Sequence, residues 1–436
     1  MPPREPALPH CLYLSSAFPP IAQVGGLRAY KFARHLPAAG WRVTVLCAPV
    51  PAATADDGLL AQLPADVRVV RGWGRPEDAL VDERSEAGLF DGSGATSSPL
   101  RGRLAALRRK QLPPDFLPLG RREIPRAWHG LAAAEAVIEE ERPDVILASI
   151  DPEATMVAGA RLSQRHGIPL VLDFRDPWAT CDLRRGARWP LQRRLVDAIE
   201  RGAVEQASAV IWNTETARSV ASEHYGPELA AKFSVVRNHH DSGLIGRAVA
   251  QQPDAQGPFR LLILGRLRKY VEGAVLFRAL ALLRAAGVTA EQLLVEIAGT
   301  VPVESVRFAT ELGVGDLVKV KGSVPHAEIG EAMARADLLL ALTHASMQRI
   351  PSKLYDYLAT DLPVVVLADN PEIAAMTAEF AGVAQLPLDD AAGLASALAT
   401  AMAKRGERFD RDVSCFDSRV ATGQLSAILR QAVAHG

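Results

Sequence analysis

Short apolar runs alternate with amphipathic stretches along almost the whole chain. Several runs lack internal alternation of apolar and polar residues, as expected of central strands covered on both faces. Between them, apolar residues recur at the spacing of amphipathic helices. Strands are predicted at 10–15, 42–47, 67–70, 145–149, 170–174, 209–212, 260–264, 293–298, 318–320, 338–342 and 364–367, and helices include 26–38, 131–141, 154–166, 273–286 and 374–380.

This succession is typical of parallel sheets built from right-handed strand–helix–strand units. It is interrupted by a polar and then basic insertion at 75–126 and by a stretch without periodicity at 247–258. The 436 residues are too many for one compact core. We therefore predict a first domain at 1–246, a linker at 247–258, a second domain at 259–408, and a final segment at 409–436 whose helix packs back on the first domain.

The predicted fold class is α/β, with two doubly wound, Rossmann-like domains facing each other across a cleft. Sheets of this kind bind ligands at the carboxyl ends of their strands. Candidate functional residues are therefore those that directly follow a predicted strand.

Composition is that of an ordinary globular enzyme, with 48% hydrophobic and 23% charged residues. The net charge of −1 gives no reason to expect a nucleic-acid partner. Four cysteines without a CxxC spacing favour reduced thiols. Because the sequence shows neither a signal peptide nor an uncharged apolar run near the ~20 residues that span a bilayer, we expect a cytoplasmic location. High Ala and Arg usage suggests a bacterial source.

Gly25 and Gly26 stand where the loop after the first strand turns into a helix. Residues without side chains at a helix N-terminus let backbone N–H groups approach an anion or a sugar. An ordinary strand–helix turn is the alternative.

The stretch LVLDFRDPWAT places four polar or aromatic residues at the carboxyl end of the strand at 170–174. A carboxylate–guanidinium pair there could position an acceptor hydroxyl or neutralise a phosphate. The alternative is a salt bridge that stiffens the loop, although such a loop would not need an exposed tryptophan. We predict Arg175 and Asp176 as catalytic residues and Asp173 and Trp178 as acceptor-side residues.

In the second domain, the strand at 338–342 is followed by a polar loop and a helix that begins at Pro351-Ser352. Lys353 adds positive charge at the positive end of the helix, which would suit a diphosphate. Asp356 lies on the same helix face, where its carboxylate could accept hydrogen bonds from ribose hydroxyls. An ordinary capped helix is the alternative.

Basic residues also follow the first strand of the second domain, in the stretch GRLRKYVEG. Arg266, Arg268 and Lys269 would stabilise negative charge on a leaving diphosphate. A solvated basic loop is the alternative. His344 could contact phosphate or sugar, although a lone histidine is more often structural. Because the sequence contains no HExxH, no Cys/His metal spacing and no D-x-D at the end of a predicted strand, we expect no metal and no cofactor.

Together these segments resemble the family 4 retaining glycosyltransferases, in particular their bacterial polysaccharide branch. The resemblance covers nearly the whole chain. It rests on LYLSSAFPP with GGLRAYKFARHLPAAGWRVTVL, on RPDVILAS with LSQRHGIPLVLDFRDPW, and on ADLLLAL with IPSKLYDYLATDLPVVV.

The resemblance implies a role for each matching residue. Gly25 and Gly26 match the glycine loop near the donor diphosphate and acceptor, and Arg266 matches the basic residue of a Gly-Arg motif. The donor-binding set also includes Lys353 and Ser352. The family's second lysine falls at Val271, so Lys269 stands in for it. The family's E-x7-E motif becomes Gln348 and Asp356, with Asp356 expected on ribose; Asp361 replaces a usual glycine, and Asn238-His-His-Asp241 replaces a usual Asn-x-Gly-x-Asp.

The resemblance implies transfer of a hexosyl group from a nucleotide sugar, with UDP or GDP as the nucleotide, to a hydroxyl acceptor with retention of configuration. It implies no metal and no protein nucleophile. The protein's contribution is then positioning and charge stabilisation. A nucleotide-sugar epimerase or phosphorylase of the same fold, and a non-catalytic sugar-nucleotide-binding protein, are the alternatives.

Residues 101–126 carry eight basic side chains against two acidic ones, interleaved with leucine and phenylalanine. This mixture suits peripheral contact with anionic lipid on the inner face of a membrane. A lipid-linked acceptor, common among the proteins that the chain resembles, would give a reason for such contact. The alternative is a solvated loop that closes over the active site.

Overall fold

The computed structural model describes residues 8–20, 24–50, 57–74, 123–150, 153–185, 189–245, 257–267, 270–322, 324–343 and 345–435. They form two compact units, each built on one sheet. The first contains the described residues up to His239 and those from Phe416 on, and the second contains His240–Cys415. Most of the insertion at 75–126 and of the linker at 247–258 lies outside the described residues.

The first unit has a seven-stranded parallel sheet in the order β3-β2-β1-β4-β5-β6-β7. Strand order reverses between β1 and β4, which is where doubly wound sheets bind ligands. The strands are β1 (His10–Leu14), β2 (Arg42–Cys47), β3 (Val67–Arg71), β4 (Val145–Ile150), β5 (Leu170–Phe174), β6 (Ala209–Trp212) and β7 (Phe233–Val235).

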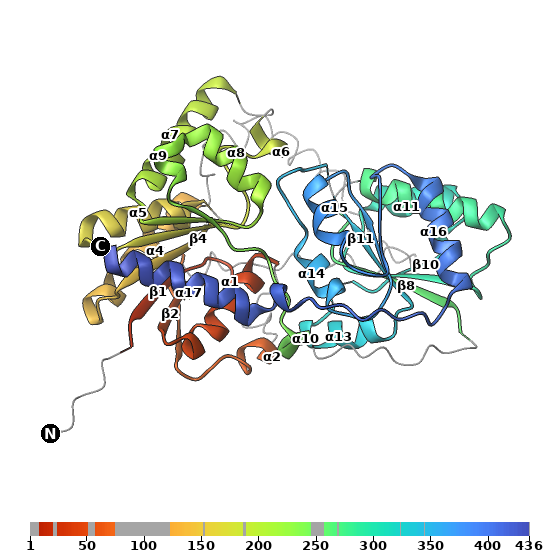
Figure 1. Cartoon of the computed structure of the whole chain (residues 1–436), viewed down its shortest axis with the longest axis horizontal. Helices are drawn as coiled ribbons and strands as arrows, with labels where there is room; N and C mark the ends of the chain where they lie inside the picture. Colours follow the sequence, from red (N-terminus) through yellow and green to blue (C-terminus); the bar gives the residue numbers. More distant parts are fainter. Residues whose placement is uncertain are drawn as a thin grey trace, which may run out of the picture. The chain divides into compact units, whose positions relative to one another are not determined.

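The helices of the first unit cover both faces of its sheet (Figure 1). Helices α4, α5, α7 and α8 contribute to the main apolar core, whereas α1 contacts the C-terminal helix α17. The helices are α1 (Val24–His35), α2 (Asp57–Leu60), α4 (Glu123–Glu140), α5 (Ala154–His166), α6 (Asp182–Arg185), α7 (Pro190–Gln206), α8 (Glu215–Tyr225), α9 (Pro227–Ala230) and α17 (Ser418–His435).

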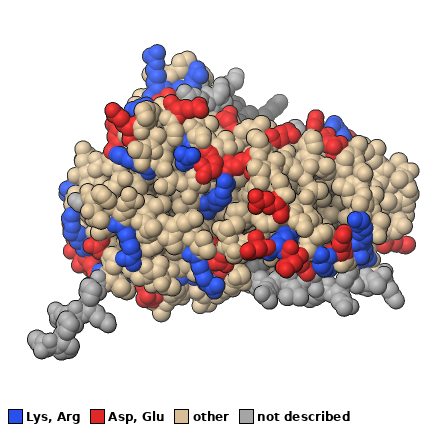
Figure 2. All heavy atoms as spheres, viewed as in Figure 1, with Lys and Arg blue, Asp and Glu red and all other residues tan. Residues whose placement is uncertain are grey.

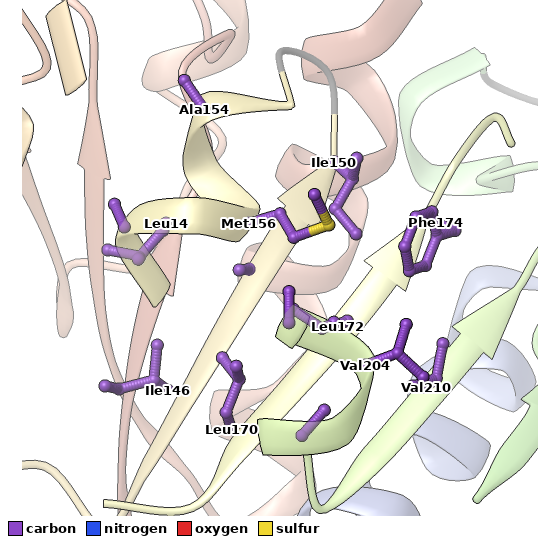
Figure 3. Close-up of a cluster of buried hydrophobic side chains, with 14 of the residues drawn as sticks. Leu14, Ile146, Ile150, Ala154, Met156, Leu170, Leu172, Phe174, Val204 and Val210 are labelled. Carbon is purple, nitrogen blue, oxygen red and sulfur yellow. The ribbon is translucent and has the colours of Figure 1, made fainter. Parts of the chain in front are cut away.

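Alternate residues of the strands build the main core of this unit. In Figure 3, Met156 of α5 lies over side chains from β4 and β5, among them Ile150 and Leu172. Successive side chains of a strand point to opposite faces of a sheet, so the residues between them face α1 and α17. On that second face, Ser149 of β4 is paired with Asp173 of β5, and both are buried. A polar layer therefore lies beneath the carboxyl edge of the sheet.

Helix α17 follows the second unit in the chain but belongs to the first. Its buried residues recur at helical spacing, from Ser418 to Ala432, and it contacts α1, β4 and β5. Trp41 donates its indole N–H to Ser426 Oγ at 2.9 Å, and Arg430 donates to Ala39 O at 3.0 Å. These contacts close the second face of the first sheet.

The second unit has a six-stranded parallel sheet in the order β10-β9-β8-β11-β12-β13, with its reversal between β8 and β11. The strands are β8 (Phe259–Leu264), β9 (Leu293–Ala298), β10 (Val318–Val320), β11 (Leu338–Leu342), β12 (Val364–Leu367) and β13 (Val383–Leu386). The helices are α10 (Ser242–Ile245), α11 (Tyr270–Ala285), α12 (Val303–Glu311), α13 (His326–Ala334), α14 (Ser352–Leu358), α15 (Pro371–Thr377) and α16 (Ala391–Ala403).

The structure confirms the predicted α/β class and two parallel, Rossmann-like sheets. Some element bounds were wrong. The last four residues assigned to the insertion belong to α4, and the helix predicted at 26–38 ends at His35, before a 3₁₀ turn over Pro37–Ala39. Edge strands β7 and β13 were not predicted, because each is short and only partly buried. Among the helices that the structure describes, none has both the length and the apolar character needed to cross a bilayer.

Candidate functional site

In the second unit, side chains of helix α14 form hydrogen bonds with both the N–H and the carbonyl of Leu264, the last residue of β8. The N–H of Leu264 donates to the Tyr357 hydroxyl at 2.8 Å, and Lys353 Nζ donates to the Leu264 carbonyl at 2.9 Å. Burial raises the pKa of Tyr357, which keeps its hydroxyl protonated. Lys353 therefore places its ammonium at the carboxyl end of β8, where the strand order reverses.

Two glycines bring the loops after β8 and β9 into contact. Gly265 has a φ of +91°, and a Cβ on Gly299 would lie 2.1 Å from the Gly265 carbonyl oxygen. Neither position tolerates a larger residue without movement of the backbone. The contact places Arg266 beside Thr300, whose hydroxyl accepts from Arg266 Nε at 3.0 Å. Arg266 is thus exposed, but this hydrogen bond fixes the orientation of its side chain. Thr300 was not predicted as part of the site.

The loop after β11 is shaped by a buried residue that sequence reasoning missed. Asn370 Nδ2 donates to the carbonyls of Ser346, Met347 and Arg349 at 3.3, 3.0 and 3.3 Å. Its Oδ1 accepts from the N–H of Glu372 at 2.9 Å and so caps α15. One side chain therefore fixes both the loop and the next helix.

The remaining candidates of the second unit lie along this loop and α14. Gln348 is buried, whereas Ser352 and Asp356 are half-buried. Because α14 has only seven residues, positive charge here rests on Lys353 more than on the helix dipole. Lys269 and His344, and Arg268 beside them, lie outside the described residues. The predicted roles of these side chains stay predictions.

In the first unit, a buried arginine organises the carboxyl edge of the sheet. Arg28 of α1 forms a two-point ion pair with Asp173 of β5, with Nη2 at 2.8 Å from Oδ1 and Nε at 3.0 Å from Oδ2. It also donates to the carbonyls of Val236 and Arg237, at 2.9 and 3.0 Å. The guanidinium thus joins α1, β5 and the segment after β7.

Lys31, one turn further along α1, also joins this helix to the segment after β7. It is buried, and its Nζ donates to the His239 carbonyl at 2.6 Å. Neither Lys31 nor Arg28 was predicted, because helix periodicity assigns a charged residue to the solvent face. The available signal was Asp173 itself, since a carboxylate within a buried apolar strand requires a partner.

The structure corrects one expectation for the loop after β5. Asp173 pairs with Arg28, whereas the carboxylate–guanidinium pair within the loop itself is Arg175 with Asp176, whose Nη2 and Oδ2 lie 3.5 Å apart. Trp178 is not an exposed ring but only 2% exposed, within the main core. Arg175 and Asp176 are half-buried and remain candidates at this edge.

A buried carboxylate anchors the same loop from below. Glu200 of α7 accepts hydrogen bonds from the N–H of Ala179, at 2.8 Å, and from the Tyr225 hydroxyl. Burial raises the pKa of Tyr225 well above its usual range, so this hydroxyl stays a donor. The loop after β5 is therefore tied directly to α7.

The glycine pair lies in the first turn of α1. A Cβ on Gly26 would approach the backbone of Ala17 and Phe18 to 3.2 Å, so the helix start packs closely on the loop after β1. Gly25 precedes it within α1. Their predicted contact with a donor or acceptor stays a prediction.

Within the described residues, no group of three or more His, Cys, Asp or Glu side chains could hold a metal ion. Independence from metal stays a prediction.

Two family models match the chain. Glycosyltransferase Family 4 matches residues 25–242, and Glycosyl transferases group 1 matches residues 247–410. Among curated proteins, none matches this chain by sequence.

Solved structures resemble the chain along nearly its whole length. Sucrose-phosphate synthase from Thermosynechococcus elongatus is 14% identical, with a TM-score of 0.61 over 98% of this chain and 94% of that one. Anabaena HepE in complex with UDP is 17% identical, with a TM-score of 0.57 over 98% and 96%. UDP-GlcNAc 2-epimerase from Methanocaldococcus jannaschii is 14% identical, with a TM-score of 0.53 over 97% and 99%. At these identities, the similarity shows a shared fold and not a shared reaction.

Proposed function

The chain belongs to glycosyltransferase family 4, and from this premise we propose that it transfers a hexosyl group from a nucleotide sugar to a hydroxyl acceptor. We further propose that transfer proceeds with retention and without a metal, in the synthesis of a polysaccharide, glycolipid or other glycoconjugate. HepE was solved with UDP and with UDP-glucose, which supports UDP sugars as the first donors to examine, followed by GDP sugars.

The observation that carries this proposal is that two cations are held at the carboxyl end of β8. Lys353 Nζ lies 2.9 Å from the Leu264 carbonyl, and Arg266 follows two residues later, oriented by Thr300. Lys353 belongs to helix α14, and Arg266 belongs to the loop after β8. Paired cations at the reversal of strand order suit a diphosphate, which carries its charge close together.

In the proposed reaction, the acceptor oxygen bonds to the anomeric carbon as the bond from that carbon to the diphosphate oxygen breaks. The acceptor attacks from the face that the leaving group vacates, and a leaving-group phosphate oxygen takes the acceptor proton. Negative charge grows on the diphosphate, and Arg266 and Lys353 stabilise it there. We assign acceptor binding to the first unit, at Arg175 and Asp176 in the loop that directly follows β5.

Incubation with a panel of UDP and GDP sugars tests the reaction. A transferase releases nucleotide faster when a hydroxyl acceptor is added, and EDTA leaves the rate unchanged. Nuclear magnetic resonance of the product then reports the anomeric configuration, which we expect to match that of the donor. An altered sugar with no net transfer to the acceptor would identify an epimerase, and binding without turnover would identify a non-catalytic protein; either result contradicts the proposal.

Asp356→Asn is expected to weaken nucleotide binding about tenfold, because a neutral amide replaces a charged acceptor of ribose hydrogen bonds. Isothermal titration calorimetry with the nucleotide alone measures this. Asp389→Asn, an exposed aspartate in the same unit, is the matched control and should bind as the parent does. Unchanged affinity in Asp356→Asn would reduce this residue to a structural element of α14.

A further inference from the structure

The outward side of helix α7 carries a line of apolar and small residues. Leu191 is 66% exposed and Leu195 45% exposed, and Ala198 and Gly202 are exposed further along the helix. Their spacing of three or four positions places all four along one side of α7. The opposite side of the helix is buried in the main core of the first unit. That core therefore does not explain the apolar character of the outward side.

Gly202 is the least expected of these residues, because glycine weakens the interior of a helix relative to alanine. A Cβ at this position would meet no atom of the described residues within 4 Å. The packing of one chain thus gives no reason for a glycine there. A glycine of this kind suits a place where another molecule approaches the helix closely.

A groove of about 270 Å³ lies between α5 and α7 and includes Gly202 in its lining. Both helices also contribute apolar side chains to it. These are Val157, Ala160, Ile199 and Ala203. Because Leu195 precedes Ile199 by one turn, the exposed leucines lie just before the groove along α7. The helix therefore presents protruding side chains in its first half and a groove in its second half.

The charges beside this line have opposite signs. Arg194 and Glu205 are both exposed and eleven positions apart, which is about three helical turns, so they lie on the same flank of α7. Neither forms an ion pair with another residue that the structure describes. Figure 2 shows basic and acidic side chains near one another over the part of the first unit where Figure 1 places α7. The charge of this surface is therefore mixed.

We propose that the outward side of α7 is the interface of a symmetric dimer, in which the α7 helices of two copies of this chain pack antiparallel. In such a pair, related by a twofold axis, the first half of each helix lies against the second half of the other. With the axis between Ala198 and Gly202, Ala198 of one copy faces Gly202 of the other, and Arg194 faces Glu205. The two leucines of each copy then enter the groove of the other.

A second copy accounts for these features together. The groove and the side chains that would fill it belong to the same helix, and the flanking charges complement each other under the same twofold symmetry. An anionic bilayer would offer nothing to fill the groove and would repel Glu205. The inference rests on exposure, shape and charge in the first unit and does not depend on the proposed reaction.

Sedimentation equilibrium of the full-length protein tests the proposal, and we expect a concentration-dependent dimer. Leu191→Gln/Leu195→Gln should raise the dimer dissociation constant about 100-fold or more, because both copies lose two apolar side chains from the interface. Gly202→Gln should raise it about 30-fold, because a side chain then obstructs the groove in both copies. In dilute solution, where the chain is monomeric, Gly202→Gln should unfold at a higher urea concentration than the parent, because glutamine favours a helix.

An exchange of charges tests the symmetry of the interface. Arg194→Glu and Glu205→Arg each place like charges opposite one another and should weaken the dimer about tenfold or more. When the two variants are mixed, opposite charges meet in both flanking pairs. The mixture should therefore form a dimer of two different chains with an affinity close to that of the parent.

Matched controls use exposed residues of the second unit, Leu282→Gln for apolar contact and Arg307→Glu for charge, and should dimerise as the parent does. Urea unfolding in dilute solution verifies that each variant folds. The proposal is overturned if the parent is monomeric at every concentration, if the controls weaken the dimer equally, or if the mixture dimerises no better than its components. It is also overturned if Leu191→Gln/Leu195→Gln leaves the dimer unchanged, since the two copies then meet elsewhere.

Discussion

Arg266→Ala is expected to lower kcat/KM about 100- to 1000-fold, because a charged donor aimed at a developing anion typically contributes roughly 2.7–4 kcal/mol to the transition state. The side chain is exposed and donates to the Thr300 hydroxyl at the surface, so the free energy of unfolding should change by less than about 0.5 kcal/mol. Steady-state kinetics with the best donor of the panel and urea unfolding measure the two effects.

Two further variants sharpen this result. Lys353→Ala should lose activity to a similar extent, with about 1 kcal/mol of stability lost as well, because it also gives up the bond to Leu264. Arg307→Ala, an exposed arginine of α12, should retain full activity. Near-normal turnover in folded Arg266→Ala or Lys353→Ala would remove that residue from the diphosphate site.

Arg28→Met is expected to destabilise the first unit by about 3–5 kcal/mol, because it leaves Asp173 buried and without its counter-charge. Arg28 is 4% exposed and Asp173 1% exposed, so water cannot replace the lost ion pair. All six tryptophans of the chain precede residue 240, in the first unit, so tryptophan fluorescence in urea follows the unfolding of this unit alone.

The double variant Arg28→Met/Asp173→Leu removes both charges and should be less destabilised than Arg28→Met alone. Arg218→Met, which breaks the exposed ion pair with Glu215 on α8, should cost no more than about 1 kcal/mol. A loss below 1 kcal/mol in Arg28→Met would mean that the Asp173 carboxylate finds another partner or becomes protonated.

The sequence predicted the two sheets well because their central strands are continuous apolar runs. The strands at 170–174 and 338–342 coincide with β5 and β11. Edge strands β7 and β13 were not predicted, because a strand at the edge of a sheet needs no continuous apolar run. The glycine–arginine turn and Lys353 were predicted from the local sequence pattern, since the turn directly follows a strand and Lys353 lies at the start of a helix.

Contacts between residues distant in sequence could not be predicted in the same way. Arg28 and Asp173 are 145 positions apart, and only the order of strands β1, β4 and β5 brings them together. Trp178 was misjudged because a polar loop sequence does not reveal that its aromatic ring turns inward. The contacts of Asn370 with the carbonyls of the preceding loop join residues more than twenty positions apart and leave no local signal in the sequence.

The placement of α17 has a consequence for how the protein is made. The ribosome finishes the whole second unit, a continuous segment, before it synthesises the helix that closes the second face of the first sheet. During translation the second unit can therefore fold first, although the first unit was synthesised earlier. Until α17 emerges, the surfaces around Trp41 that it covers stay open to chaperones. A nonsense mutation within the second unit would damage the first as well.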